Sequence, residues 1–198
     1  MAKVLVIRLS AIGDVAMTVP VIYSAAKANP EDSFTVLTQA FLMPLFMNRP
    51  PNVEVIGINT KGAEKGLIGL LKFISALLKF DFDVILDLHN VIRTIIICTF
   101  FRLNGKRVFV LDKARKERKR LTAIKGKRLY PLRPVIVRYA DVFRAAGLNY
   151  TETFTSLYEE FPAELSGMAS VAGIKKGKWI GVAPVSYTHL RAHETRED

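Results

Sequence analysis

The first residue whose type and position suit chemistry is Asp14, in the short polar loop Ser10–Asp14. The loop follows Val4–Ile7, a continuous apolar run with β-branched residues that is typical of a buried strand. A helix-like apolar run, Val15–Ala28, comes next. Ligands bind at the carboxyl ends of the strands in parallel α/β sheets, so this carboxylate lies where a ligand is expected.

Asp14 has a plainer interpretation as the N-cap of the following helix, where it would accept hydrogen bonds from free backbone N–H groups. Pro20 argues against this interpretation, because proline fits only the first turn of a helix. With Thr18 as the cap, Pro20 falls in that first turn and Asp14 lies on a preceding turn, free to act. The loop has one glycine, Gly13, where a dinucleotide-binding fingerprint needs three, which argues against that class of Rossmann domain.

A second polar group follows a later expected strand, Val84–Leu88. It consists of His89, Asn90, Arg93 and Thr94. Because the carboxyl ends of parallel strands meet at one edge of a sheet, these side chains are expected near Asp14. Arg93 has the planar donor geometry that holds a carboxylate or phosphate through two hydrogen bonds. The alternative is that Asn90 caps a helix and Arg93 is simply solvated.

The stretch from Asp112 to Arg133 carries ten Lys or Arg residues against two acidic residues. Such a stretch is typical of a solvated, mobile loop. Its position is more informative, because it follows the expected strand Arg107–Leu111 and would attract a polyanion at the same edge of the sheet. The sequence pI near 9.9 leaves a nucleic-acid-binding protein as an alternative. Against that alternative, no aromatic residue interleaves the cations between Leu111 and Leu129.

The expected elements alternate along the first three quarters of the chain. Strands are expected at Val4–Ile7, Ser33–Thr38, Val53–Ile58, Val84–Leu88 and Arg107–Leu111. Helices are expected at Val15–Ala28, Ala40–Met47, Lys65–Phe80, Val91–Leu103 and Pro134–Ala146. This alternation predicts an α/β fold with a Rossmann-like parallel sheet and helices on both faces.

The expected helix Lys65–Phe80 presents a stripe of lysines, because Lys65, Lys72 and Lys79 recur every seven residues. Leu and Ile residues cover most of the remaining surface. One interpretation is a crossover helix that packs on the sheet and leaves its lysines in water. The other is an interfacial helix that rests on anionic lipid.

The composition bounds the class of protein. The chain has 198 residues, half of them hydrophobic, and a formal net charge of +11, which fits one or two globular domains. Its single cysteine, Cys98, lies in an apolar helical run, so no intrachain disulfide can form and a reducing cytosol is expected. The first residues run directly into a strand, so no signal peptide is expected. No segment reaches the roughly eighteen uncharged apolar residues of a membrane span.

The last quarter of the chain has a different character. Residues 149–178 have the composition of an interdomain linker, and residues 179–184 are expected to form a new strand. Residues 185–198 lack apolar periodicity and are expected to be a non-native tail. Within that tail His189 and His193 stand beside Glu194, but no third ligand or H-E-x-x-H pattern supports zinc, so no metal site is expected.

Three separate segments resemble the ADP-heptose:lipopolysaccharide heptosyltransferases, glycosyltransferase family 9. Val6–Pro20 matches every fixed position of the family's N-terminal signature, (R/K)-x-S-x-x-G-D-(I/V)-x-x-(T/S)-x-P. Phe82–Thr94 resembles the family's central strand and following loop, and Val137–Gly147 resembles the helix that closes the first domain. The resemblance extends over about residues 3–184.

The resemblance implies a two-domain GT-B glycosyltransferase. Residues 1–148 would be its N-terminal acceptor domain, and residues 179–184 the first strand of a donor domain that is otherwise missing. The implied reaction is an inverting, metal-independent transfer of heptose from ADP-heptose to the lipopolysaccharide inner core, without a cofactor. This chain alone would lack the donor site and be inactive. The implied location is cytoplasmic, at the inner face of the inner membrane, with an anionic glycolipid as partner and no nucleic acid.

The resemblance also assigns roles to particular residues. Asp14 would be the general base, with Ser10 and Gly13 shaping its loop and contacting the acceptor. Residues that would contact the acceptor come from the later loop and the basic stretch: His89, Asn90, Arg93, Thr94, Arg115, Lys116, Arg118, Lys119 and Arg120.

Overall fold

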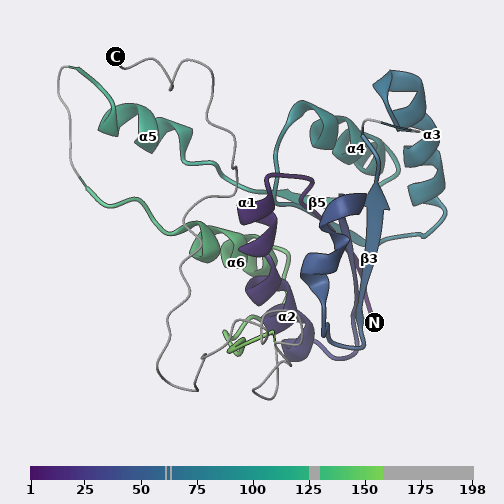
Figure 1. Ribbon diagram of the computed structural model, residues 1–198, viewed down its shortest axis with the longest axis horizontal. Helices are drawn as coiled ribbons and strands as arrows, with labels where there is room; N and C mark the ends of the chain where they lie inside the picture. Colours follow the sequence, from purple (N-terminus) through teal and green to yellow (C-terminus); the bar gives the residue numbers. More distant parts are fainter. Residues whose placement is uncertain (61, 63, 125–129, 158–198) are drawn as a thin grey trace, which may run out of the picture. The chain divides into compact units, whose positions relative to one another are not determined.

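The computed structural model describes residues 1–60, 62, 64–124 and 130–157, and Met1–Leu157 form one compact unit. Five strands form a parallel sheet in the order β3-β2-β1-β4-β5 (Figure 1). They are β1 (Lys3–Ile7), β2 (Ser33–Gln39), β3 (Val53–Ile58), β4 (Val84–Asp87) and β5 (Arg107–Val110). This arrangement confirms the predicted Rossmann-like parallel sheet. Its cause is that runs of β-branched and aliphatic residues favour strands covered on both faces.

Helices cover both faces of this sheet. They are α1 (Ile12–Ala16), α2 (Val19–Ala28), the 3₁₀-helix η1 (Ala40–Phe46), α3 (Gly66–Leu78), α4 (Ile92–Leu103), α5 (Arg115–Leu121) and α6 (Val135–Ala145). Side chains of β1 alternate between two cores, as the pleat of a strand requires. Val4 and Val6 pack with residues of α2 and α6, whereas Leu5 and Ile7 pack with residues of α3 and α4.

The order of the strands places a switch point between β1 and β4. The strands β2 and β3 are added on one side of β1, and the chain then crosses to the other side for β4 and β5. In open parallel sheets the ligand crevice lies outside the carboxyl ends of the strands at such a point. The segments that follow β1 and β4 therefore meet where a ligand is expected.

The prediction of one helix over Val15–Ala28 is wrong, because two helices cover this region. Pro20 lies in the first turn of α2 and Thr18 is its N-cap residue, as predicted. Asp14, however, lies inside α1 and not on a free turn. The break has a simple cause, since the ring of Pro20 in a continuous helix would clash with the carbonyl group of Ala16, where α1 ends.

Two further segments differ from their predicted structure. The short helix near Ala40 is a 3₁₀-helix with Pro44 inside it, and proline cannot donate the hydrogen bond that a regular α-helix needs. The basic stretch, expected to be a loop, contains α5. Arg, Lys and Glu are good helix formers, and the Asp112 carboxylate accepts the N–H of Ala114 at 2.8 Å just before this helix.

Beyond α6 the chain returns along α2 without regular secondary structure as far as Leu157. Backbone N–H groups of Thr153 and Phe154 donate to the hydroxyl of Ser24 at 3.1 and 3.2 Å. The rest of the expected linker, the strand at 179–184 and the tail with His189 and His193 lie outside the described residues. Over the described part of the chain, no helix is long and apolar enough to span a bilayer.

Candidate functional site

A cavity of about 360 Å³ lies at the carboxyl ends of β1 and β4, at the switch point of the sheet. Segments far apart in the sequence contribute to it: the loop after β1, the loop after β4, the basic stretch and the first half of α6. Its lining residues are Arg8, Ser10, Ala11, Asp14, His89, Leu111, Lys113, Arg118, Val135, Arg138 and Tyr139. The cavity thus gathers Asp14, Ser10, His89 and Arg118 from the residues predicted to form the site.

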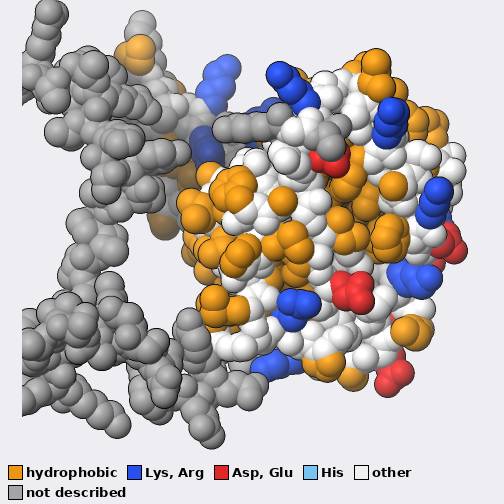
Figure 2. All heavy atoms as spheres, turned by 45° about the vertical axis from the view of Figure 1, so that its right-hand side comes forward, with side chains coloured by type: hydrophobic (Ala, Val, Ile, Leu, Met, Phe, Trp, Pro, Cys, Tyr) orange, Lys and Arg blue, Asp and Glu red, His pale blue; other side chains and the backbone are white. Residues whose placement is uncertain are grey.

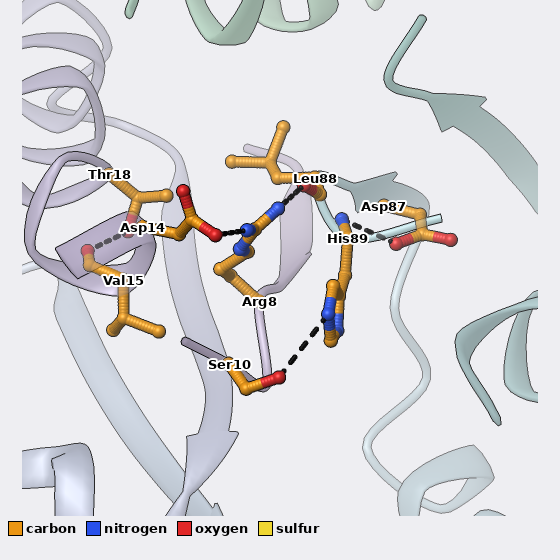
Figure 3. Close-up of polar contacts among 8 residues, drawn as sticks. All are labelled: Arg8, Ser10, Asp14, Val15, Thr18, Asp87, Leu88 and His89. Carbon is orange, nitrogen blue, oxygen red and sulfur yellow. Dashed lines mark hydrogen bonds and ion pairs between the residues drawn. The ribbon is translucent and has the colours of Figure 1, made fainter. Parts of the chain in front are cut away.

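Asp14 is held by an ion pair with Arg8 (Figure 3). The guanidinium group of Arg8 is buried, and its Nη1 donates to the carbonyl oxygen of Leu88 at 2.6 Å. Arg8 therefore links the loop after β4 to the carboxylate of α1, because a buried guanidinium group must be paired. The Asp14 side chain remains 42% exposed, so its carboxylate is fixed in orientation while open to a ligand.

The side chain of Arg8 lies between Asp14 and His89, and the Nε2 atom of His89 is 3.4 Å from the hydroxyl oxygen of Ser10 (Figure 3). Burial, with further contributions from Arg8 and Lys113, lowers the pKa of His89 to about 4. The imidazole is therefore neutral near pH 7. Its Nδ1 atom is buried without a hydrogen-bond partner among the described residues, so Nε2 is the ring nitrogen left to meet a ligand.

The loop that carries His89 is organised by Asp87, a fully buried carboxylate at the end of β4. Its Oδ1 atom accepts the backbone N–H groups of His89 and Asn90 at 2.9 and 2.8 Å. Its Oδ2 atom accepts the hydroxyl of Thr94 at 2.8 Å. Thr94 is also fully buried and accepts the N–H of Val91 at 3.0 Å. Asp87 thus fixes both the loop and the start of α4.

Several predicted acceptor residues lie outside the cavity. The side chain of Asn90 donates to the carbonyl oxygen of Leu111 at 3.0 Å. Arg93 donates to the carbonyl oxygen of Glu64 at 3.0 Å, and the hydroxyl of Thr94 donates to the carboxylate of Asp87. Each of these three side chains therefore supports the loop through at least one hydrogen bond.

The predicted basic residues of α5 divide into three sets by position. Arg118 lines the Asp14 cavity, while Arg115 and Lys116 line a neighbouring cavity of about 440 Å³. Lys119 and Arg120 are exposed on α5 and line neither of these cavities.

The Asp14 cavity has a positive electrostatic character. Arg8, Lys113, Arg118 and Arg138 line it, against one carboxylate. Burial, aided by Arg115 and Arg8, lowers the pKa of Lys113. A cleft lined by one sign of charge concentrates ligands of the opposite sign, so the cavity favours an anion.

Gly13 lies in α1, and a Cβ atom added to it would meet nothing within 4 Å. The fold therefore does not require glycine here, and the small residue leaves open space beside Asp14. The predicted role of Gly13 in shaping the loop around Asp14 stays a prediction.

Four polar lining residues were missed from the predicted site: Arg8, Lys113, Arg138 and Tyr139. Arg8 carried a signal, because it is a charged residue directly after an apolar strand and a fixed position of the signature. Lys113 was one member of the basic stretch. Arg138 and Tyr139 carried none, since their approach depends on how α6 packs. The hydroxyl of Tyr139 is buried without a hydrogen-bond partner in the described part of the chain, and burial raises its pKa.

Within the described residues no three His, Cys, Asp or Glu side chains gather as a metal site. The prediction of a reaction without a metal stays a prediction.

No family model and no curated protein matches this sequence. Solved structures do match it. A family 9 glycosyltransferase from Veillonella parvula aligns at 21% identity with a TM-score of 0.55, over 75% of this chain and 42% of the other. E. coli heptosyltransferase WaaC with ADP aligns at 22% identity with a TM-score of 0.52, over 78% and 49%. The same enzyme with ADP-2-deoxy-2-fluoro heptose aligns at 21% identity with a TM-score of 0.52, over 78% and 50%.

This likeness concerns the fold. The chain has the Rossmann-like architecture of the N-terminal part of GT-B glycosyltransferases, so the resemblance predicted from the sequence is confirmed at that level. The chain spans about half the length of the solved proteins that it matches.

Proposed function

We propose that this chain forms the acceptor-binding half of a family 9 glycosyltransferase, in which Asp14 is the general base. One observation carries the proposal: the signature residues Arg8, Ser10 and Asp14 line a single cavity at the switch point of the sheet. The signature is a property of the sequence, whereas the cavity is a property of the fold. Their coincidence at one place is the reason to connect them.

In the proposed reaction an acceptor hydroxyl group lies against the exposed carboxylate of Asp14. As the hydroxyl oxygen bonds to the anomeric carbon of the donor sugar, its proton passes to Asp14. The bond between the anomeric carbon and the phosphate oxygen breaks on the opposite face, and the configuration inverts. Arg8 keeps the carboxylate in position, and the neutral ring of His89 can hold a neighbouring hydroxyl group of the acceptor.

The proposed acceptor is an anionic, phosphate- and carboxylate-bearing glycolipid core of the lipopolysaccharide type. The cationic lining of the cavity supports an anionic sugar, and the exposed cations of α5 can meet further phosphate groups. The proposed donor is ADP-heptose, by analogy with the E. coli enzyme, which binds ADP and a fluorinated ADP-heptose. Donor binding is assigned to a second domain, and catalysis to the cytoplasmic face of the inner membrane, with neither metal nor cofactor.

The test is Asp14→Asn in the full-length protein that carries this domain. We expect transfer to fall by at least about 100-fold, because the amide cannot take the proton while its shape is preserved. Transfer is measured as heptose incorporated from ADP-heptose into deacylated core glycolipid. Glu31→Gln, an exposed acid outside the cavity, is the matched control and should leave the rate unchanged. An Asp14→Asn variant with more than a tenth of the normal rate would remove Asp14 as the base.

Nucleic-acid binding is the second candidate, and the exposed cations on α5 are the observation that favours it. It makes no use of the Asp14 cavity, which allows the two candidates to be separated by variants of the cavity and of α5.

A further inference from the structure

The outer side of α3 is unusual for a helix that packs on a sheet. Its inner side contributes Leu70, Ile74 and Leu77 to the core. Three more aliphatic residues are exposed: Leu67 at 61%, Ile68 at 73% and Leu71 at 38%. The interpretation in which the aliphatic residues of this helix pack on the sheet and only its lysines reach water is therefore incomplete.

The exposed side of α3 is also basic. Lys65, Lys72 and Lys79 are all exposed, and at about 100° per residue they form one stripe that lies next to Ile68. No acidic residue occurs from Lys65 to Phe80. The net charge of this surface is therefore positive.

The acidic residues on either side of α3 already have partners. The Glu64 carboxylate accepts the N–H of Asn59 at 2.8 Å, and Asp81 forms an ion pair with Lys106 at 2.6 Å. Lys106 thus neutralises Asp81, whereas Glu64 keeps its charge and offsets at most one of the three lysines.

The first turn of α4 extends the apolar surface. Ile92 and Ile95 are exposed, Ile92 at 79%. Arg93, between them, donates to the carbonyl oxygen of Glu64 and so ties this turn to the start of α3. Figure 2 shows this side of the molecule, where hydrophobic side chains gather on the surface with Lys and Arg side chains around them.

We propose that this outer α3–α4 face, formed by Leu67, Ile68, Leu71, Ile92 and Ile95 with the three lysines, docks on an anionic lipid bilayer. Exposed aliphatic side chains gain free energy when they enter the boundary between headgroups and acyl chains. Lysines next to them extend their ammonium groups to anionic headgroups while their methylene stems cover apolar surface. The proposal stands on exposure and charge, and it does not depend on the proposed glycosyl transfer.

The outer α3–α4 face lies close to the edge of the sheet that carries the Asp14 cavity, so docking would bring the membrane near that cavity. The starts of α3 and α4 follow the carboxyl ends of β3 and β4, which is the edge of the sheet that carries the Asp14 cavity. A bilayer bound there lies at the same edge as the cavity. A lipid-linked ligand would then reach the cavity by diffusion in the plane of the membrane.

The experiment is co-sedimentation of the 198-residue chain with vesicles of phosphatidylcholine alone or with about one third phosphatidylglycerol. We expect binding to the anionic vesicles only. The double variant Leu67→Gln, Ile68→Gln keeps every charge and should weaken binding about tenfold. Its matched control is Leu103→Gln, which removes an equally exposed leucine from the other end of α4 and should bind as the parent does.

A charge pair of variants completes the test. Lys65→Glu with Lys72→Glu should weaken binding by at least roughly fivefold per lysine, whereas Lys27→Glu on α2 should have little effect. Far-UV circular dichroism and the urea midpoint confirm that each variant folds.

Three outcomes would overturn the proposal. The first is unchanged vesicle binding by the Leu67→Gln, Ile68→Gln variant, which would assign binding to α5 alone. The second is equal loss in the Leu103→Gln variant. The third is a dimer in light scattering that the double variant dissociates, because a second copy of the chain would then cover the face. None of these measurements uses glycosyl transfer, so they are independent of the fate of Asp14.

Discussion

Two charged regions at the carboxyl edge of the sheet differ in burial: the network around Asp87 and Arg8, and the cations of α5. Around Asp87 and Arg8 the charges are buried, and each has fixed partners at hydrogen-bond distance. On α5 the cations are exposed, and water and salt screen them. The first arrangement creates a defined geometry, because a buried charge is stable in very few positions. The second creates a positive field, for which no single side chain is essential.

This contrast assigns different work to the two regions in the proposed function. A proton transfer needs a base whose position is fixed to a fraction of an ångström, which the network around Asp14 can supply. An anionic glycolipid with several phosphate groups needs only a surface of matching charge. We therefore expect single substitutions to have large effects near β4 and small effects on α5.

The largest expected effect is that of Asp87→Ala on stability. The substitution leaves the N–H groups of His89 and Asn90 and the hydroxyl of Thr94 without their acceptor, in a buried place. We expect the free energy of unfolding to fall by about 3–5 kcal/mol. Urea denaturation measures it. Asp83→Ala is the control, because the exposed Asp83 accepts one N–H, that of Lys3, and its loss should cost less than about 1 kcal/mol. Equal losses would show that the two regions do not differ in this way.

A smaller effect is expected from the protonation of His89. Its pKa is about 4 in the folded protein, below the ordinary value of about 6.5 in the unfolded chain. Folding therefore favours the neutral ring, and this contribution is fully present above about pH 6.5 and is lost as the pH falls toward 4. Because the ring is only partly buried, we expect a contribution of about 1–2 kcal/mol.

The measurement for His89 is the pH dependence of unfolding, compared with that of His89→Gln, between pH 7 and 4. The parent should lose more stability than the variant over this range. The ring signal that disappears from the NMR spectrum of the variant should titrate near pH 4. A midpoint near 6.5 for that signal would contradict the burial of this ring.

The smallest effect on stability is expected on α5. Neutralising Arg115, Lys119 and Arg120 to Gln should change the free energy of unfolding by less than about 0.5 kcal/mol, because exposed charges contribute little.

The same triple variant should weaken binding to phosphorylated core glycolipid and to a random DNA duplex, both in a salt-dependent manner. Arg138→Gln, which changes the cavity, should weaken only the glycolipid. The nucleic-acid alternative would be favoured if the protein bound the duplex more tightly than the glycolipid and Arg138→Gln left glycolipid binding unchanged.

The sequence by itself determined the sheet, the break before α2 and the identity of Asp14. These features depend on local causes. A run such as Val4–Ile7 must be buried on both faces, and Pro20 cannot lie in the interior of a continuous helix. The signature around Asp14 is likewise contiguous, so it can be recognised without knowing which distant segments pack beside it.

Only the tertiary structure decided which side chains share the cavity. Arg93 follows the correct strand but donates to Glu64, whereas Arg138 and Tyr139 line the Asp14 cavity from α6, far along the chain. It also decided that Leu67 and Ile68 are exposed, although apolar side chains of this kind are usually found in a core. The physical reason is that periodicity specifies which face of an element is apolar. How far each side chain reaches, and what covers it, depends on the packing of elements that are distant in sequence.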